Sequence, residues 1–148
     1  MPDCLFCQII SGQLSAAIVF EDEHSIAFLD RRPLFPGHCL LIPQTHHTTL
    51  MDLPSELVPP LFLSAQRVAR AVELAMQAEG IFVGINNRIS QSVAHLHIHI
   101  VPRRKGDGLK GFFWPRTQYS GDEAMAETAE RIRAALRLLD NSPPSSPC

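Results

Sequence analysis

Short apolar runs recur along the first hundred residues of the chain and are typical of β-strands. Only residues 22–24 separate the first two runs, and so short a connection favours an antiparallel hairpin over a parallel crossover. The pattern therefore predicts an α+β fold in which a five-stranded antiparallel sheet packs with a long helix and a C-terminal helix. The predicted strands cover residues 17–21, 25–29, 38–42, 81–86 and 95–101.

Two longer segments repeat their apolar residues every three or four positions, which is the spacing of an amphipathic helix. The first covers residues 61–79, with two prolines placed for its first turn and Gly80 after its last periodic residue. The second is predicted to begin at Ser120, which forms a capping box with Glu123, and to end near Asp140.

The composition is that of a globular protein and excludes several classes of function. Of the 148 residues, 45% are hydrophobic and 19% are charged, which excludes a disordered or fibrous chain. A net charge of −2 provides no broad basic field, so binding to a nucleic-acid backbone or to an anionic membrane is disfavoured. The apolar runs also fall far below the ~18 residues that a membrane span requires.

A single domain is expected over residues 1–140, followed by a disordered Ser/Pro-rich tail over residues 141–148. Asp3 stands where a secretory signal would carry positive charge, which favours a cytoplasmic protein. Four cysteines are too few for a disulfide scaffold at this length, and a reducing compartment keeps them as thiols or metal ligands.

Three histidines, His95, His97 and His99, alternate with aliphatic residues in the last predicted strand. Alternate side chains of a strand share one face, so the imidazoles would line one side while the aliphatics enter the core. An exposed polar face is the commoner explanation of such alternation. Because Thr, Ser or Lys would serve there without titrating near neutral pH, we favour metal ligation, acid–base catalysis or nucleophilic attack.

The sequence around these histidines resembles the histidine-triad (HIT) family of nucleotide hydrolases and transferases. Residues 91–101, Gln-Ser-Val-Ala-His-Leu-His-Ile-His-Ile-Val, match the family motif of three histidines alternating with apolar residues. Residues 27–30 and 36–43 are similar to the ribose-binding strand and the Pro-Gly-His strand of the family. The resemblance extends from about Cys4 to about Arg104. It implies a HIT-like fold, a purine-nucleotide substrate and a homodimer with the long helix at its interface.

The resemblance implies that His97 attacks the α-phosphorus of a nucleotide and forms a covalent nucleotidyl-histidine, which water then hydrolyses. The main-chain carbonyl of His95 would orient His97, while His99 would contact phosphate oxygens. His38 looks like the fourth histidine that supports this network, although an ordinary buried histidine on an apolar strand explains it equally well.

Further positions look like the nucleotide-binding residues of the family. Asp30 can accept two hydrogen bonds from a ribose diol, although aspartates are also common at strand-end turns. Gln91 and Ser92 resemble contacts to the phosphate and the leaving group. Asn86 aligns with a phosphate-contacting asparagine, but the chain is shorter between Asn86 and Gln91. An apolar clamp around the base, equally suited to an ordinary core, would comprise Leu5, Phe6, Ile9 and Phe28.

Cys4 and Cys7 form a CxxC pair, which by itself does not separate a redox pair from two unrelated thiols. Its position at the very start of the chain argues against a redox pair that opens a helix of a βαβ unit. In a subset of histidine-triad proteins a similar pair joins two histidines in a structural zinc site. The matching residues here are His46 and His95, with His47 as an alternative to His46.

The third triad position is His99 and not the glutamine that is expected of the uridylyltransferase-like branch of the family. The resemblance therefore disfavours nucleotidyl transfer to a sugar phosphate and favours hydrolysis. Residues 101–107 look more like the dinucleoside-polyphosphate hydrolases, whereas the CxxC pair and Asp30 look more like the phosphoramidases. Cations within residues 103–110 would hold a polyphosphate chain or form a solvated loop. The sequence thus predicts a hydrolase of AMP-X substrates. A non-catalytic nucleotide-binding adaptor is the alternative.

Overall fold

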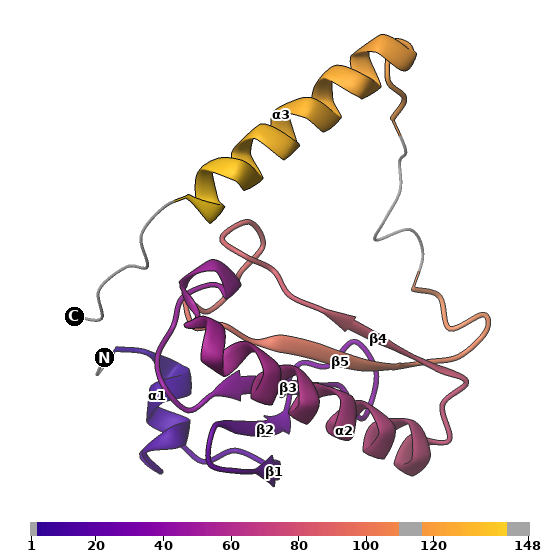
Figure 1. Ribbon diagram of the computed structural model, residues 1–148. Helices are drawn as coiled ribbons and strands as arrows, with labels where there is room; N and C mark the ends of the chain where they lie inside the picture. The colour runs from indigo at the N-terminus through magenta and orange to yellow at the C-terminus, as the bar shows by residue number, and fades with distance from the viewer. Residues whose placement is uncertain (1–2, 110–116, 142–148) are drawn as a thin grey trace. The chain divides into compact units, whose positions relative to one another are not determined.

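The computed structural model describes residues 3–109 and 117–141, and the first of these ranges contains an antiparallel sheet (Figure 1). Within residues 3–109 the sheet has five strands in the order β1-β2-β3-β5-β4. The α+β class, the antiparallel sheet and the first hairpin are therefore confirmed. The strands are β1 (Ile18–Glu21), β2 (Ser25–Leu29), β3 (Cys39–Pro43), β4 (Gly80–Gly84) and β5 (Ile98–Arg103).

The long helix α2 (Val58–Met76) packs its apolar stripe against one face of the sheet. Its first turn contains the two prolines, as predicted, because the N–H groups of a first turn have no partner within the helix. The predicted end at residue 79 was wrong. Gln77 adopts a left-handed conformation with φ of 51° and ends the helix, and Gly80 begins β4.

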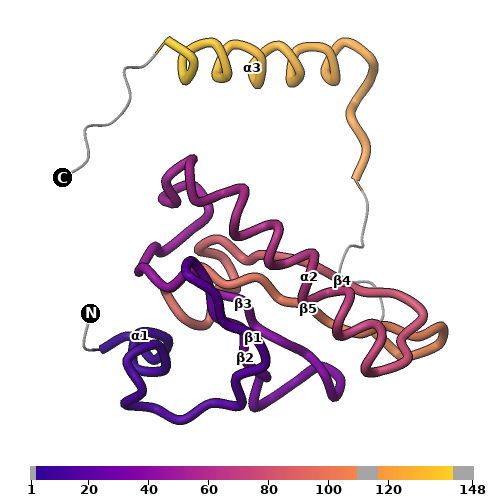
Figure 2. The backbone as a smooth tube through the Cα atoms, turned by 60° about the horizontal axis from the view of Figure 1, so that its bottom comes forward, coloured from indigo at the N-terminus to yellow at the C-terminus, as the bar shows by residue number. Residues whose placement is uncertain are grey.

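A short helix, α1 (Leu5–Ile10), covers the other face of the sheet and was not predicted. Its buried residues Phe6 and Ile9 pack with Ile26, Phe28 and other side chains that alternate with the α2-facing residues of the same strands. In Figure 2 the strands β1, β2 and β3 lie between α1 and α2. The N-terminal segment is thus part of the core and not an arm.

Two short 3-10 helices, η1 (Leu50–Asp52) and η2 (Ser55–Leu57), connect β3 to α2. Thr49 caps η1, because its hydroxyl and its N–H both bond to the carboxylate of Asp52. This connection holds the residues that follow β3 close to the start of β5, where the triad lies.

The chain forms two compact units, residues 1–107 and 108–148, and the second contains α3 (Asp122–Asp140). The end of this helix at Asp140 was predicted correctly. The capping box predicted from Ser120 was wrong, because the N-cap is Gly121, which has no side chain that could cap the helix. From residue 142 on, the expected Ser/Pro-rich tail lies outside the described residues. Among the described helices, none has the length and hydropathy of a membrane span.

Candidate active site and metal cluster

The triad lies where β5 begins, and of its three members only His99 belongs to the strand. The strand was predicted to start three residues earlier. Pro43, at the end of the neighbouring β3, has no N–H with which to continue the ladder, and Leu96 donates its N–H to the carbonyl of His47 instead. The rings nevertheless gather on one side, with the centroids of His97 and His99 4.9 Å apart.

His97 is anchored through one ring nitrogen only. Its Nδ1–H donates to the carbonyl oxygen of His95 at 2.7 Å, so Nε2 carries the lone pair of the neutral ring. The residue is only 1% exposed. In residues 3–109 and 117–141, however, every side-chain N or O atom that is shielded from solvent has a hydrogen-bond partner. Because Nε2 has no such partner within these ranges, it must reach the molecular surface.

His38 and His99 are joined by a hydrogen bond of 3.0 Å between Nε2 of His38 and Nδ1 of His99. Burial lowers the pKa of His38, while the nearby carboxylate of Asp30 opposes this effect. Burial, together with the neighbouring His97 and His38, lowers the pKa of His99 to about 4. Both rings are therefore neutral at pH 7. The hydrogen bond joins His38 to the triad, and its supporting role stays a prediction.

Asp30 follows β2 and lies beside this pair. One carboxylate oxygen, Oδ1, accepts the N–H of Arg32 at 2.9 Å. The other, Oδ2, is 3.9 Å from Nε2 of His38, which is too long for a hydrogen bond. Asp30 is 24% exposed, so Oδ2 is open to a ligand that approaches the histidines. Its position is compatible with the ribose contact, which stays a prediction.

The residues of the expected apolar clamp are only partly brought together. Phe6, Ile9 and Phe28 are buried in one cluster, and the rings of Phe6 and Phe28 meet edge to face at 5.4 Å. Phe6 also approaches the ring of His97 at 5.3 Å between centroids. Leu5 is 52% exposed and lies outside this cluster.

The loop before the triad is held in an unusual conformation. Gln91 bridges two segments, because its amide N–H donates to the carbonyl of Thr48 at 2.6 Å and its Oε1 accepts the N–H of Arg88 at 2.8 Å. Arg88 and Ser90 both have positive φ, of 70° and 59°. Such strain in non-glycine residues is typical of functional loops. Asn86 is half-buried at its start.

Ser92 is exposed, and with Thr48 and the N-terminal segment it lines a groove of about 420 Å³ next to Cys4 and His46. Its contact with a leaving group stays a prediction. Two of the predicted cations, Arg103 at the end of β5 and Arg104 after it, lie at the opposite end of that strand from the triad. Arg103 pairs with Asp107, and Arg104 donates to the carbonyl of Met76 at the end of α2. These contacts favour a structural turn over a polyphosphate site.

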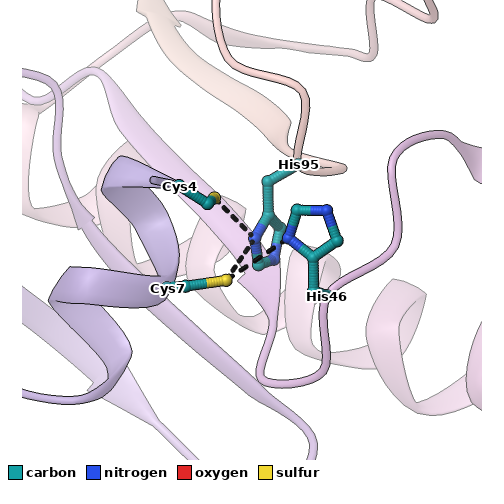
Figure 3. A group of neighbouring side chains, drawn as sticks. All are labelled: Cys4, Cys7, His46 and His95. Carbon is teal, nitrogen blue, oxygen red and sulfur yellow. Dashed lines mark hydrogen bonds between the residues drawn. The ribbon is translucent and has the colours of Figure 1, made fainter. Parts of the chain in front are cut away.

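Two cysteines and two histidines meet at the N-terminus of α1 (Figure 3). Cys7 Sγ lies 3.3 Å from Nδ1 of His46, and Nδ1 of His95 lies 3.5 Å from Cys4 Sγ and 3.6 Å from Cys7 Sγ. All four ligand atoms lie within 4.8 Å of one another. His47 points elsewhere, with its Nε2 bonded to the hydroxyl of Thr45. Of the two alternatives, His46 is the residue that joins the group.

The donor set of this cluster fits a metal ion. Nε2–H of His95 donates to the carbonyl of Pro43 at 3.0 Å, which leaves the lone pair on Nδ1, facing the thiols. Burial lowers the pKa of His95 to about 4 and also lowers that of His46, so both rings are neutral ligands at pH 7. Burial and the hydrogen bond with Cys4 raise the pKa of the Cys7 thiol. Two thiols and two imidazoles are a set that zinc prefers.

The family model described as the HIT domain matches residues 11–106 of the chain. The chain belongs to the HIT family. It is 41% identical to the Bacillus subtilis protein named "Protein hit" over 90% of this chain and 92% of that one. It is also 32% identical to the adenosine 5′-monophosphoramidase HNT1 of Saccharomyces cerevisiae, over 81% of this chain and 75% of that one.

Solved structures of HIT proteins share the fold. A HIT-family crystal structure from Bacillus subtilis superposes with a TM-score of 0.82 and 35% identity, covering 89% of this chain and 96% of that one. A zinc-bound histidine-triad protein from Mycobacterium smegmatis gives a TM-score of 0.70 and 39% identity, covering 94% and 96% of the two chains. The HIT-like fold expected from the motif is thus confirmed.

Three main-chain features of this HIT site were not found from the sequence. The carbonyl of Pro43 holds His95, the N–H of Leu34 contacts His38, and the strained segment at Arg88 and Ser90 precedes the triad. Main-chain groups carry no residue-specific signal, so a motif cannot identify them. A positive φ at Ser90 had no signal either, because glycine is the residue that usually marks that conformation.

Proposed function

We propose that this HIT protein hydrolyses AMP-X substrates, namely dinucleoside polyphosphates or nucleoside phosphoramidates, at the α-phosphate through a covalent nucleotidyl-His97. The observation that carries the proposal is which ring nitrogen of His97 holds the proton and which holds the lone pair. Its N–H is held by the carbonyl of His95, and its lone pair is left on an accessible Nε2. The name of the yeast relative, a monophosphoramidase, supports this class of substrate.

The reaction takes two displacements at one phosphorus. Nε2 of His97 attacks the α-phosphorus, the bond from phosphorus to X breaks, and X leaves with the electron pair and takes up a proton. Water then attacks the same phosphorus and gives up one proton to the solvent, which balances the proton taken up by X. The P–N bond breaks with its electron pair on nitrogen, so AMP is released and the free imidazole is restored. During attack the ring becomes positively charged, and the carbonyl of His95 at 2.7 Å stabilises that charge through Nδ1–H.

The remaining site residues are proposed to bind the purine nucleotide. Asp30, with one free carboxylate oxygen, would hold the ribose, and His99 would donate to a phosphate oxygen. The phosphate and leaving-group contacts would come from Asn86, Gln91 and Ser92, and the base contacts from Leu5, Phe6, Ile9 and Phe28. An apolar clamp offers few hydrogen bonds, so adenine and guanine are expected to bind similarly.

We further propose that zinc occupies the cluster formed by Cys4, Cys7, His46 and His95. A closed site with four protein ligands supplies structural cross-linking and leaves no open position for substrate. The cluster would fix α1 against the start of β5, and with it the carbonyl of His95 that anchors His97. The zinc-bound mycobacterial neighbour supports this assignment.

We also propose a cytoplasmic homodimer with α2 at its interface. Phe62 and Leu63 of α2 are 41% and 66% exposed, which is a costly arrangement for large apolar side chains in a monomer. A buried interface over this part of α2 would remove them from water.

The proposed function predicts turnover that depends on one histidine. Wild-type protein is expected to hydrolyse adenosine 5′-phosphoramidate or a diadenosine tri- or tetraphosphate, and His97→Ala is expected to lose at least about 1,000-fold in kcat, since it lacks the nucleophile. His24→Ala, in the exposed β1–β2 turn, is the matched control and should keep the wild-type rate. Nucleotide binding without turnover in the wild type would instead indicate an adaptor.

A further inference from the structure

The loop between β2 and β3 folds back on itself beside the triad. Its two ends are joined by a hydrogen bond of 2.9 Å from the N–H of Asp30 to the carbonyl of His38. The N–H of His38 in turn donates to the carbonyl of Phe35 at 3.0 Å. This closure directs the main-chain N–H of Leu34 at Nδ1 of His38, with 3.1 Å between the two nitrogens.

Gly37 makes this closure possible. Its φ is 97°, in the region that favours glycine, and a Cβ at this position would lie 2.6 Å from Cγ of Met76 on α2. Leu34 is 53% exposed, and its contact with His38 is made by its main-chain N–H and not by its side chain. The contact to His38 is therefore a property of the loop's backbone.

The direction of this hydrogen bond fixes the positions of two protons. A main-chain N–H only donates, so Nδ1 of His38 must accept and the neutral ring must carry its proton on Nε2. That Nε2–H faces Nδ1 of His99 at 3.0 Å, so Nδ1 of His99 must accept in its turn. The neutral ring of His99 then carries its proton on Nε2, the nitrogen that is not tied to His38.

We propose that the main-chain N–H of Leu34 is a positioning group that sets the tautomer of His38 and, through it, of His99. His99 thereby presents an N–H donor, while His97 presents a lone pair from the same row of rings. This inference rests on the proposed function, because a donor at His99 is useful only if a phosphate or leaving group binds there. The main-chain N–H of Leu34 would then explain why His99 presents a donor where His97 presents a lone pair.

A cation site is the competing interpretation of the same side chains. Asp30, His38 and His99 offer ligand atoms that lie within 4.8 Å of one another. A cation between the two rings would need the lone pair of Nε2 of His38, which would move the proton to Nδ1. That proton would then face the N–H of Leu34, donor against donor, at a nitrogen separation of 3.1 Å. The loop therefore favours a hydrogen-bonded relay.

The test removes one hydrogen-bond donor without changing a side chain. Leu34 is replaced by its α-hydroxy analogue in the full-length protein, so that an ester oxygen takes the place of the N–H. The tautomers of His38 and His99 are then determined from two-bond 1H–15N spectra of histidine-labelled protein. The control is the same replacement at Phe35, whose N–H makes no hydrogen bond to residues 3–109.

In the wild type and in the Phe35 ester both rings should be protonated on Nε2. In the Leu34 ester both should change together to Nδ1–H, and kcat with adenosine 5′-phosphoramidate should fall at least about tenfold. His38 and His99 that keep their Nε2 protons in the Leu34 ester would overturn the proposal. The spectra are independent of turnover, so an inactive wild type would refute the proposed function and leave this test intact.

Side-chain variants provide a second test if the Leu34 ester does not fold. In His38→Gln, the Leu34 N–H can bond to the amide oxygen and leave the NH2 group to donate to His99, so His99 should keep its Nε2 proton. His38→Leu removes the donor, and His99 should then populate both tautomers, with a loss of at least about tenfold in kcat. An unchanged His99 tautomer in His38→Leu would contradict the relay.

Discussion

Two histidines of the triad, His95 and His97, are held through opposite ring nitrogens, and this difference separates their chemistry. His95 donates Nε2–H to the carbonyl of Pro43 and turns Nδ1 towards the cysteines. His97 donates Nδ1–H to the carbonyl of His95 and keeps Nε2 accessible. The main-chain acceptors thus leave the lone pair of the first ring facing the thiols and that of the second ring without a protein partner among the described residues, as the proposed metal ligand and the proposed nucleophile require.

The buried histidines also determine how the unfolding free energy depends on pH. His95 and His99 each have a pKa lowered to about 4, against 6.5 for an unperturbed imidazole. Between these values the unfolded chain binds protons that the folded chain excludes. Metal-free protein should therefore lose up to ~1.4 kcal/mol of unfolding free energy per pH unit for each ring as pH falls from about 6.5 towards 4.

Urea unfolding of the metal-free protein at several pH values measures this dependence. His99→Gln should flatten the pH dependence by the share of that ring. A pH dependence that is identical in wild type and His99→Gln would show that His99 is not held neutral in the folded state.

The sequence could predict which residues gather at the candidate site, whereas the tautomers of His38, His95 and His99 could not be predicted. The triad, His38 and the Cys4–Cys7 pair were recognised because their residue types and spacing are themselves the signal. The contacts of Pro43 and Leu34 to the histidines depend on where the backbone turns. The conformation of these loops cannot be derived from the histidine motif.

At the scale of elements, apolar periodicity predicted the sheet and α2 but not the ends of the elements. β5 starts at Ile98 instead of the predicted residue 95, because Pro43 at the end of the adjacent strand β3 has no N–H with which to continue the pairing. The helix α1 was missed because six residues are too few to show a helical period, and its stability comes from burying Phe6 and Ile9. Both deviations are tertiary effects that no local pattern contains.

The end of α2 offers a test at this scale. Gln77 is exposed and holds a left-handed φ of 51°, which costs a residue with a Cβ about 1 kcal/mol or more. Gln77→Gly should therefore raise the unfolding free energy by about 0.5–1 kcal/mol in urea titrations. Gln77→Ala keeps the Cβ and serves as the control, with a change within about 0.5 kcal/mol. A Gly variant less stable than the Ala variant would contradict the assigned conformation.

At the scale of the whole molecule, the cluster of Cys4, Cys7, His46 and His95 links the start of the chain to the triad. His46 and His47 form a matched pair for testing it, because only His46 faces Cys7. Elemental analysis should find one zinc per chain in wild type and in His47→Ala, and loss of zinc in His46→Ala. Loss of a structural zinc should also lower Tm.

Zinc that is retained in His46→Ala and lost in His47→Ala would place the metal elsewhere. The resemblance named His46 and kept His47 as an alternative, since the two are adjacent in the chain. The structure separates them because the segment after β3 turns His46 towards α1, while the ring of His47 bonds to Thr45.

The most direct test of the account is to capture the covalent intermediate. Wild-type protein is mixed with adenosine 5′-phosphoramidate, quenched in acid-free denaturant at short times and analysed by intact mass and peptide mapping. The account predicts an AMP adduct on His97 that forms and decays within a turnover and is absent from His97→Ala. Turnover that proceeds without any adduct at any quench time, and that persists in His97→Ala, would contradict it.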